Sequence, residues 1–175
     1  MSINGLWLLS EIYVSASSNN YWKSKLSEGS RNIHLAIMRE PYLSFILNGS
    51  KTIESRFTLN KIDPYGNIST GDIIILKKSA GAIEGIFEAG AVVFVRADSE
   101  DDIHKVRQNF GSRLLVSDEF WEKKVNSRYV TLIEVRNLLA IKPIVVSMKN
   151  RRSWFLLGTT DNLRLNCLHS DENAQ

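Results

Sequence analysis

The sequence predicts an α+β fold built around a small, mainly antiparallel β-barrel with peripheral helices. Residues 71–78, 83–97 and 128–141 are rich in β-branched residues, which is typical of strands. Glycines interrupt the second of these stretches, as expected of bulges or tight bends. Strands and helices do not alternate regularly along the chain, and this argues against a doubly wound parallel sheet.

Capping residues predict where three helices begin. Pro41 lies at the first turn of a segment that ends before Gly49, an arrangement typical of a short helix. Ser99 can cap a second helix that runs to about Phe110, and Ser117 can cap a third. Acidic residues follow both serines and suit the positive end of a helix. Capping therefore explains these acidic residues better than a metal site does.

The chain divides into three parts by composition. Apolar residues recur at helical spacing near the N-terminus before a Ser/Asn run, so residues 1–30 are predicted to form a helical extension and a linker. Residues 31–160 contain the strand pattern and are predicted to form the domain, and residues 161–175 are predicted to be a polar tail. With 43% hydrophobic residues in a length of 175, the chain can bury one proper core.

Composition restricts the classes of function. The net charge of +3 and the sequence pI near 9.0 permit an anionic partner without requiring one. A single cysteine, Cys167, excludes an internal disulfide framework, and the three histidines show no zinc-binding spacing, so we expect no metal and no cofactor. No apolar segment is long enough to span a membrane, and we expect a cytoplasmic location without a membrane partner.

The stretch "NGSKTIESRF" places Lys51, Glu54 and Arg56 close together after a glycine. A phosphate-binding loop would need another glycine five residues before a Gly-Lys pair and a helix directly after it. Here Ser50 separates Gly49 from the lysine, and a strand pattern follows, so the nucleotide triphosphatase interpretation is rejected. The simplest alternative is a half-buried strand whose Glu54 and Arg56 form a weak ion pair in water.

The order of elements around this stretch resembles the ASCH domain, the activating signal cointegrator homology module of the PUA-like superfamily. The similar residues are "LAIMREPYLSFILNGSKTIESRF", followed by "GDIIILKKSAG" and "IEGIFEAG". The family signature is a strand, a helix with a Pro-Tyr start, and then G-x-K-x-x-E-x-R. Gly49, Lys51, Glu54 and Arg56 occupy its four fixed positions, and the resemblance covers roughly residues 33–157.

This resemblance implies a PUA-like barrel with a charged cleft that binds RNA or a nucleoside or nucleotide ligand. In that cleft Arg56 would offer a planar fork to a phosphate or a base edge, Glu54 would orient it or accept from a base amino group, and Lys51 would supply a point charge. In an ideal strand Lys51 would face away from the other two residues. Convergence therefore requires Lys51 to lie in an irregular turn after the helix, at Gly49 and Ser50.

Some ASCH proteins are N-acetylcytidine amidohydrolases, so the resemblance also implies a small hydrolase as an alternative. Lys51 matches their lysine, but Glu54 stands where they have threonine, and either Glu84 or Glu88 would be their distant glutamate. A carboxylate beside Lys51 favours the charged amine and weakens it as a nucleophile. A ribonuclease activity is also attributed to the family, without specific support in this sequence. The family name alone suggests a third alternative, a protein-interaction module.

A second basic segment lies near the C-terminal end. Arg151 and Arg152 precede Trp154, which together provide cations for phosphate and a ring for a base, so single-stranded RNA binding is predicted there. The alternative is that Trp154 packs in the core and the two arginines are merely solvated. Lys77 and Lys78, at the end of a predicted strand, are weaker candidates for nucleic-acid binding by the same argument.

Overall fold

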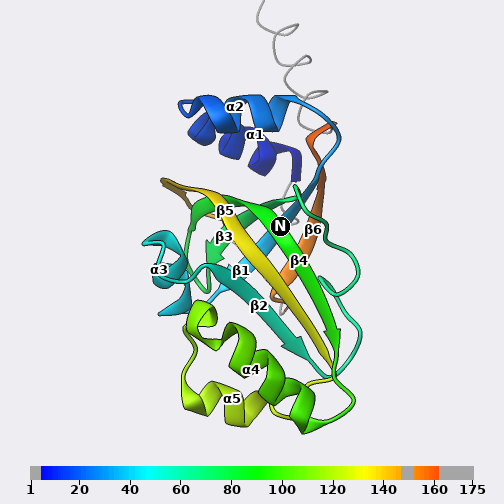
Figure 1. The fold of residues 1–175 in the computed structure, drawn as a ribbon. Coiled ribbons are helices and arrows are strands. Elements are labelled where there is room, and N and C mark those ends of the chain that lie inside the picture. Colours follow the sequence, from blue (N-terminus) through cyan, green and yellow to red (C-terminus); the bar gives the residue numbers. More distant parts are fainter. Residues whose placement is uncertain (1–4, 147–151, 162–175) are drawn as a thin grey trace, which may run out of the picture.

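The computed structural model describes residues 5–146 and 152–161, which form one mixed sheet with helices at both of its ends (Figure 1). The strand order in the sheet is β2-β5-β4-β3-β1-β6. The strands are β1 (Asn32–Met38), β2 (Ile53–Thr58), β3 (Ile73–Lys78), β4 (Ile83–Arg96), β5 (Tyr129–Ile144) and β6 (Trp154–Thr159). The helices are α1 (Gly5–Ala16), α2 (Asn20–Ser27), α3 (Tyr42–Leu47), α4 (Glu100–Leu114) and α5 (Asp118–Lys124).

The α+β class and the mainly antiparallel sheet are confirmed. Only the pair β1 and β3 is parallel among the described strands, and every other pairing is antiparallel. No described pairing joins β2 to β6, so the sheet is open in its hydrogen bonding and a closed barrel is not confirmed. The register between β4 and β5 shifts near Gly85 and again near Gly90, which confirms the predicted bulges.

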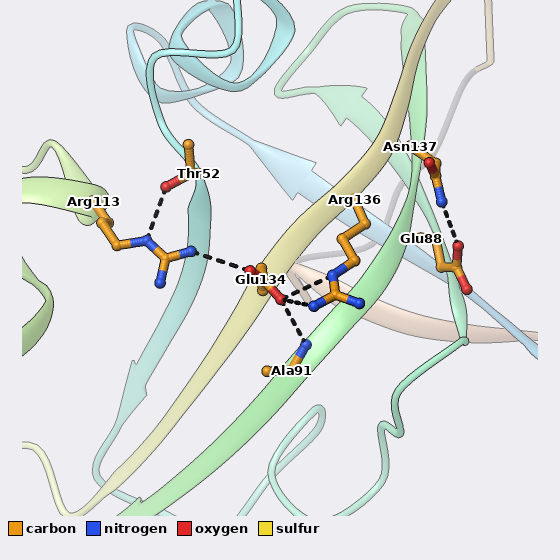
Figure 2. Close-up of polar contacts among 7 residues, drawn as sticks. All are labelled: Thr52, Glu88, Ala91, Arg113, Glu134, Arg136 and Asn137. Carbon is orange, nitrogen blue, oxygen red and sulfur yellow. Dashed lines mark hydrogen bonds and ion pairs between the residues drawn. The ribbon is translucent and has the colours of Figure 1, made fainter.

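A polar network lies over β4 at Gly90, where the register with β5 shifts. A Cβ atom at this position would meet Glu134 Oε2 at 2.5 Å and Arg136 Nε at 2.7 Å, so a side chain here would displace these two groups. The backbone N–H of Ala91 instead donates to Glu134 Oε2 at 3.1 Å, as Figure 2 shows. A glycine therefore leaves room for the Glu134 side chain to lie over β4.

The N-terminal helices pack on one end of the sheet, opposite α4 and α5 (Figure 1). Leu8, Ile12 and Trp22 are buried in an apolar cluster with residues of β1, β3, β4 and β5. The indole of Trp22 also donates to Asn137 O at 2.8 Å. The predicted helical extension is therefore helical over residues 5–16 and 20–27, and it contributes to the core of the sheet.

The capping predictions are confirmed, with one change in length. Asp102 accepts from the backbone N–H of Ser99 at 3.1 Å, and the Ser117 side chain accepts from Phe120 at 3.3 Å. Helix α4 continues one turn past the predicted end at Phe110, because Leu114 is fully buried in a cluster with the sheet. No described helix is long and apolar enough to cross a membrane.

A buried polar chain connects the starts of β1, β3 and β6. His34 and Asp72 are only 2% and 4% exposed, and His34 Nε2 lies 3.3 Å from Asp72 Oδ2. The Trp154 indole donates to His34 Nδ1 at 3.2 Å, which assigns the ring proton to Nε2, the donor to Asp72. Burial by itself would raise the pKa of Asp72, but hydrogen bonds from His34, Ser69 and Asn32 outweigh it and hold that pKa below its ordinary value.

Replacing Asp72→Asn should therefore flatten the acid sensitivity of folding. A carboxyl whose pKa is depressed in the folded protein stabilises it above the ordinary pKa near 3.8 and loses that effect as the pH falls through the folded value. We expect a loss of about 1.5–3 kcal/mol at neutral pH that shrinks in acid. Urea melts at neutral pH and near pH 3 measure it, with Asp101→Asn on the exposed face of α4 as the control. An equal loss at both pH values would contradict this account.

Candidate functional site

The turn between α3 and β2 sets the position of Lys51 relative to Glu54 and Arg56. Helix α3 ends at Leu47, and Gly49 follows with a φ of +78°, a left-handed conformation that favours glycine. The Lys51 N–H donates to Phe45 O at 2.8 Å, and β2 begins only at Ile53. Lys51 therefore lies in an irregular turn, which is the position that convergence with the strand residues requires.

The Lys51 ammonium is buried at the end of α4. The residue is 2% exposed, and its Nζ donates to Leu114 O at 2.6 Å and lies 6.0 Å from the centroid of the Tyr42 ring. The Leu114 carbonyl belongs to the last turn of the helix, where the helix dipole is negative. Burial lowers the pKa of Lys51; nearby Glu54 raises it in part, and Arg56 lowers it further.

Arg56 and Glu54 form a buried ion pair. Their side chains are 14% and 4% exposed, and Arg56 Nε lies 2.9 Å from Glu54 Oε1. The Nε–H is not aligned for a hydrogen bond, so charge attraction holds the pair. The guanidinium donates to Ser153 O at 3.2 Å and to Ile37 O at 3.4 Å, and it lies 5.1 Å from the centroid of the Trp154 ring. Arg56 thus connects β2 with the opposite edge of the sheet.

These three residues line one cleft, which we call the Lys51 cleft, with a volume of about 580 Å³. The described lining contains more cations than carboxylates, and aromatic rings lie between them. The cations are Arg39, Lys51, Arg56, Lys123 and Lys124; the carboxylates are Glu54, Asp63 and Glu119; the rings are Tyr42, Phe57 and Phe120. Such a lining suits an anionic ligand that carries a flat ring.

Two of the predicted lysines lie outside the cleft. Lys77 is 4% exposed, and its Nζ donates to Lys78 O at 3.1 Å and to Gly81 O at 2.7 Å, so its ammonium closes the turn between β3 and β4. Lys78 pairs with Glu40 at 3.0 Å. The structure does not bring Lys77 together with the motif residues, because its ammonium donates to two carbonyls of this turn and Lys77 is not among the lining residues of the cleft. The Lys78 side chain is 42% exposed and is not among the lining residues of the cleft.

The second basic segment is also divided by the structure. Trp154 is 4% exposed and packs against Arg56 and His34, which corrects the prediction that its ring stacks on a base. Arg152 is exposed and lines a neighbouring hollow. Arg151 lies outside the described residues. Trp154 therefore packs in the core, which was the alternative interpretation of the sequence.

Neither candidate for the distant glutamate lies in the Lys51 cleft. Glu88 contacts Lys25 and Tyr21 of α2 and accepts from Asn137 at 2.7 Å, the contact drawn in Figure 2. Glu84 is not among the lining residues of the cleft. The described residues also contain no group of three or more His, Cys, Asp or Glu side chains that could hold a metal ion.

A network that the sequence did not reveal fixes the position of Leu114 O. Arg113 donates to Thr52 Oγ1 at 3.1 Å and to Glu134 Oε1 at 3.4 Å, and Arg136 binds the other oxygen of Glu134 (Figure 2). Thr52 N also donates to Arg113 O at 3.2 Å. These contacts attach the last turn of α4 to the start of β2, beside Lys51. Their members are far apart in sequence, and no local pattern identifies them.

The fold is that of an ASCH domain. The crystal structure of the ASCH protein from Zymomonas mobilis is 14% identical to this chain, with a TM-score of 0.60 over 78% of this chain and 94% of that one. Structures of two point mutants of that protein are each 15% identical over 79% of this chain and 99% and 96% of theirs, with TM-scores of 0.60 and 0.61. Searches among family models and curated proteins gave no match. The likeness confirms the predicted ASCH fold.

Replacing Arg56→Ala should destabilise the protein strongly. The change leaves Glu54 buried without its partner and removes the donors to Ile37 O and Ser153 O, a loss of about 3–5 kcal/mol. Denaturant melts measure it. Arg96→Ala is the matched control, since Arg96 pairs with Asp98 on the same sheet but in water.

A double variant, Glu54→Gln with Arg56→Met, sharpens the test. It removes both charges at once, so it should recover part of the stability that Arg56→Ala loses. If Arg56→Ala melts like the wild type, the pair contributes nothing and the cleft has no buried charge at its base.

Proposed function

We propose, with the ASCH fold as the premise, that this chain binds RNA or a nucleotide-like ligand in the Lys51 cleft. The observation that carries the proposal is the state of the Lys51 ammonium. It is buried at the cleft, whereas the nearest carboxylate of the motif, Glu54, is already paired with Arg56. A buried cation without a carboxylate partner is costly to the folded protein, and an anionic ligand removes that cost.

The three motif residues have different roles in this proposal. Among described residues the Lys51 ammonium donates only to Leu114 O, so further N–H donors remain for a phosphate. Glu54 Oε2 forms no hydrogen bond with a described residue and is the acceptor for a base amino group. Arg56 differs from the sequence expectation, because its fork is occupied by backbone carbonyls. We assign it to positioning Glu54.

The remaining lining residues supply the other parts of a nucleotide site. Tyr42 and Phe120 offer ring faces and edges to a base, and their centroids lie 6.4 Å apart. Lys123 and Lys124 add positive charge from α5 at the opposite wall. The cytoplasmic location remains a prediction of the sequence.

Replacing Lys51→Met should weaken nucleotide binding by about ten-fold or more while leaving stability equal to or above that of the wild type. The methyl end group fills the space without a buried charge. Calorimetric titration with nucleoside monophosphates and short oligoribonucleotides measures affinity, and urea melts measure stability. Lys23→Met on the exposed face of α2 is the control.

The pH profile of wild-type binding gives a second test. Because the pKa of Lys51 is lowered, its ammonium loses its charge, and affinity should fall, at a lower pH than for an ordinary lysine with a pKa near 10.5.

Unchanged affinity in Lys51→Met, together with an unchanged pH profile, would contradict the proposal. A loss of affinity accompanied by a loss of stability would instead show that the ammonium supports the fold through Leu114.

A hydrolase acting on N-acetylcytidine or RNA is the second candidate, and the lowered pKa of Lys51 favours it. The sequence suggested that Glu54 would keep the lysine charged, but burial outweighs that attraction. An amine that loses its proton more readily can act as a base or nucleophile toward an amide. Against this candidate, Glu54 is engaged by Arg56, and Glu84 and Glu88 do not line the cleft.

Deacetylation of N-acetylcytidine is therefore expected to be slow or absent, and mass spectrometry of the nucleoside product measures it. Restoring the family's residue with Glu54→Thr should raise the rate only in protein that still folds, because Arg56 then lacks its partner. Efficient wild-type turnover that Lys51→Met abolishes would establish the enzyme in place of the binding protein.

A further inference from the structure

A second hollow borders the Lys51 cleft, and we call it the Tyr65 hollow. Its volume is about 820 Å³, and its lining includes Lys61, Tyr65, Asn67 and Arg152. It shares three lining residues with the cleft, namely Ile62, Asp63 and Ser153. Each of the two volumes falls in the range that holds a whole small ligand. The two spaces therefore form one continuous surface depression with Ser153 at the boundary.

The boundary between the two spaces is fixed from below. Ser153 O accepts from Arg56 at 3.2 Å, and the neighbouring Trp154 packs against the same guanidinium. Ser153 itself is exposed. A ligand that crosses from one space to the other therefore passes over a short rigid ridge of backbone, which the buried ion pair of the cleft supports.

An anchored aromatic ring forms one wall of the Tyr65 hollow. The ring of Tyr65 lies 5.2 Å from that of Phe94 and 5.0 Å from that of Tyr129, measured between centroids. Phe94 is 39% exposed, so this aromatic group reaches the surface. A ring that neighbouring rings hold in place loses little conformational freedom when a base stacks on it. Tyr65 thus provides a more accessible stacking surface than Trp154, which also lines the hollow but is only 4% exposed.

The charges of the Tyr65 hollow suit a phosphate. Lys61 and Arg152 are exposed cations on its rim, and Asp63 is the acidic member of the described lining. The Asp63 carboxylate accepts from the Asn67 side chain at 2.6 Å, which turns one of its oxygens toward its own loop. The rim therefore combines a ring with positive charge, as surfaces that bind single-stranded nucleic acid do.

We propose that the Tyr65 hollow is a second nucleotide subsite, so that the ligand is a single-stranded polynucleotide running from the Lys51 cleft across Ser153. This inference rests on the proposed function of the cleft. One nucleotide occupies the cleft, the connecting phosphate lies near Ser153, and the neighbouring base stacks on Tyr65. A mononucleotide would leave the Tyr65 hollow empty, and a duplex would not present an unpaired base to it.

Affinity as a function of oligomer length tests this inference. Fluorescence anisotropy with labelled mononucleotide, dinucleotide and hexamer, in ribose and deoxyribose forms, should show at least about a ten-fold gain from mononucleotide to hexamer. A gain in affinity with length in either the ribose or the deoxyribose series supports the second subsite. The series that shows the gain identifies the ligand as RNA or DNA.

Two substitutions assign the gain to the Tyr65 hollow. Tyr65→Leu should reduce hexamer affinity by about five-fold to a hundred-fold and leave mononucleotide affinity unchanged, while Tyr65→Phe retains the ring and the affinity. Lys61→Gln, a change at an exposed loop residue, should reduce the salt dependence of hexamer binding by about 0.7 in the log–log slope. Lys23→Gln on α2 is the matched control, with no change in slope.

The outcomes separate this inference from the proposed function. Mononucleotide binding that depends on Lys51, without any gain in affinity from length, overturns the second subsite and leaves the cleft proposal intact. A gain from length that survives both Tyr65→Leu and Lys61→Gln also overturns it, because the extra contacts then lie elsewhere. The absence of any nucleotide binding that depends on Lys51 overturns both proposals.

Discussion

The guanidinium of Arg56 joins the two edges of an open sheet, and the Lys51 cleft depends on that contact. β2 is one edge of the strand order, and β1 and β6 lie at the other. Backbone hydrogen bonds do not close this gap among the described strands, but Arg56 reaches from β2 to Ile37 O in β1 and to Ser153 O before β6. A planar guanidinium suits this task because its N–H donors point in several fixed directions, whereas the donors of a lysine ammonium rotate. The same side chain thus contacts β1, Ser153 and Glu54.

The motif therefore consists of an ion pair, Glu54 with Arg56, and a lysine outside that pair, Lys51. Glu54 and Arg56 neutralise each other at the base of the cleft, so their burial is tolerable. Lys51 forms no ion pair with a described residue and is held by the negative end of α4 through Leu114 O. The network of Arg113 and Glu134 keeps that helix end in place (Figure 2). A helix end and a polar network around it therefore both support one buried ammonium. Such an arrangement is typical of functional sites.

Local chemistry made much of this fold predictable. The caps at Ser99 and Ser117 and the turn at Gly49 depend on neighbouring residues, and all three are as the sequence indicates. The parallel pairing of β1 with β3, and the open strand order, depend on contacts between distant segments, which periodicity does not encode. Trp154 and Lys77 illustrate the same limit for side chains. Both belong to sequences typical of a binding surface, and both are buried because of what packs against them.

The two walls of the cleft differ in burial. One wall is continuous with the core: Asp72 binds His34, His34 accepts from Trp154, and Trp154 packs against the guanidinium of Arg56. Each member of that chain is fixed by the next, so Glu54 is presented to a ligand in one orientation. The other wall consists of Lys123 on α5 and of the loop with Ile62, both exposed. In the proposed function, the wall with Glu54 distinguishes between bases, and the exposed wall with Lys123 contacts the phosphate backbone of any sequence. Under the same proposal, selectivity therefore depends on Glu54, and affinity depends on the charges around it.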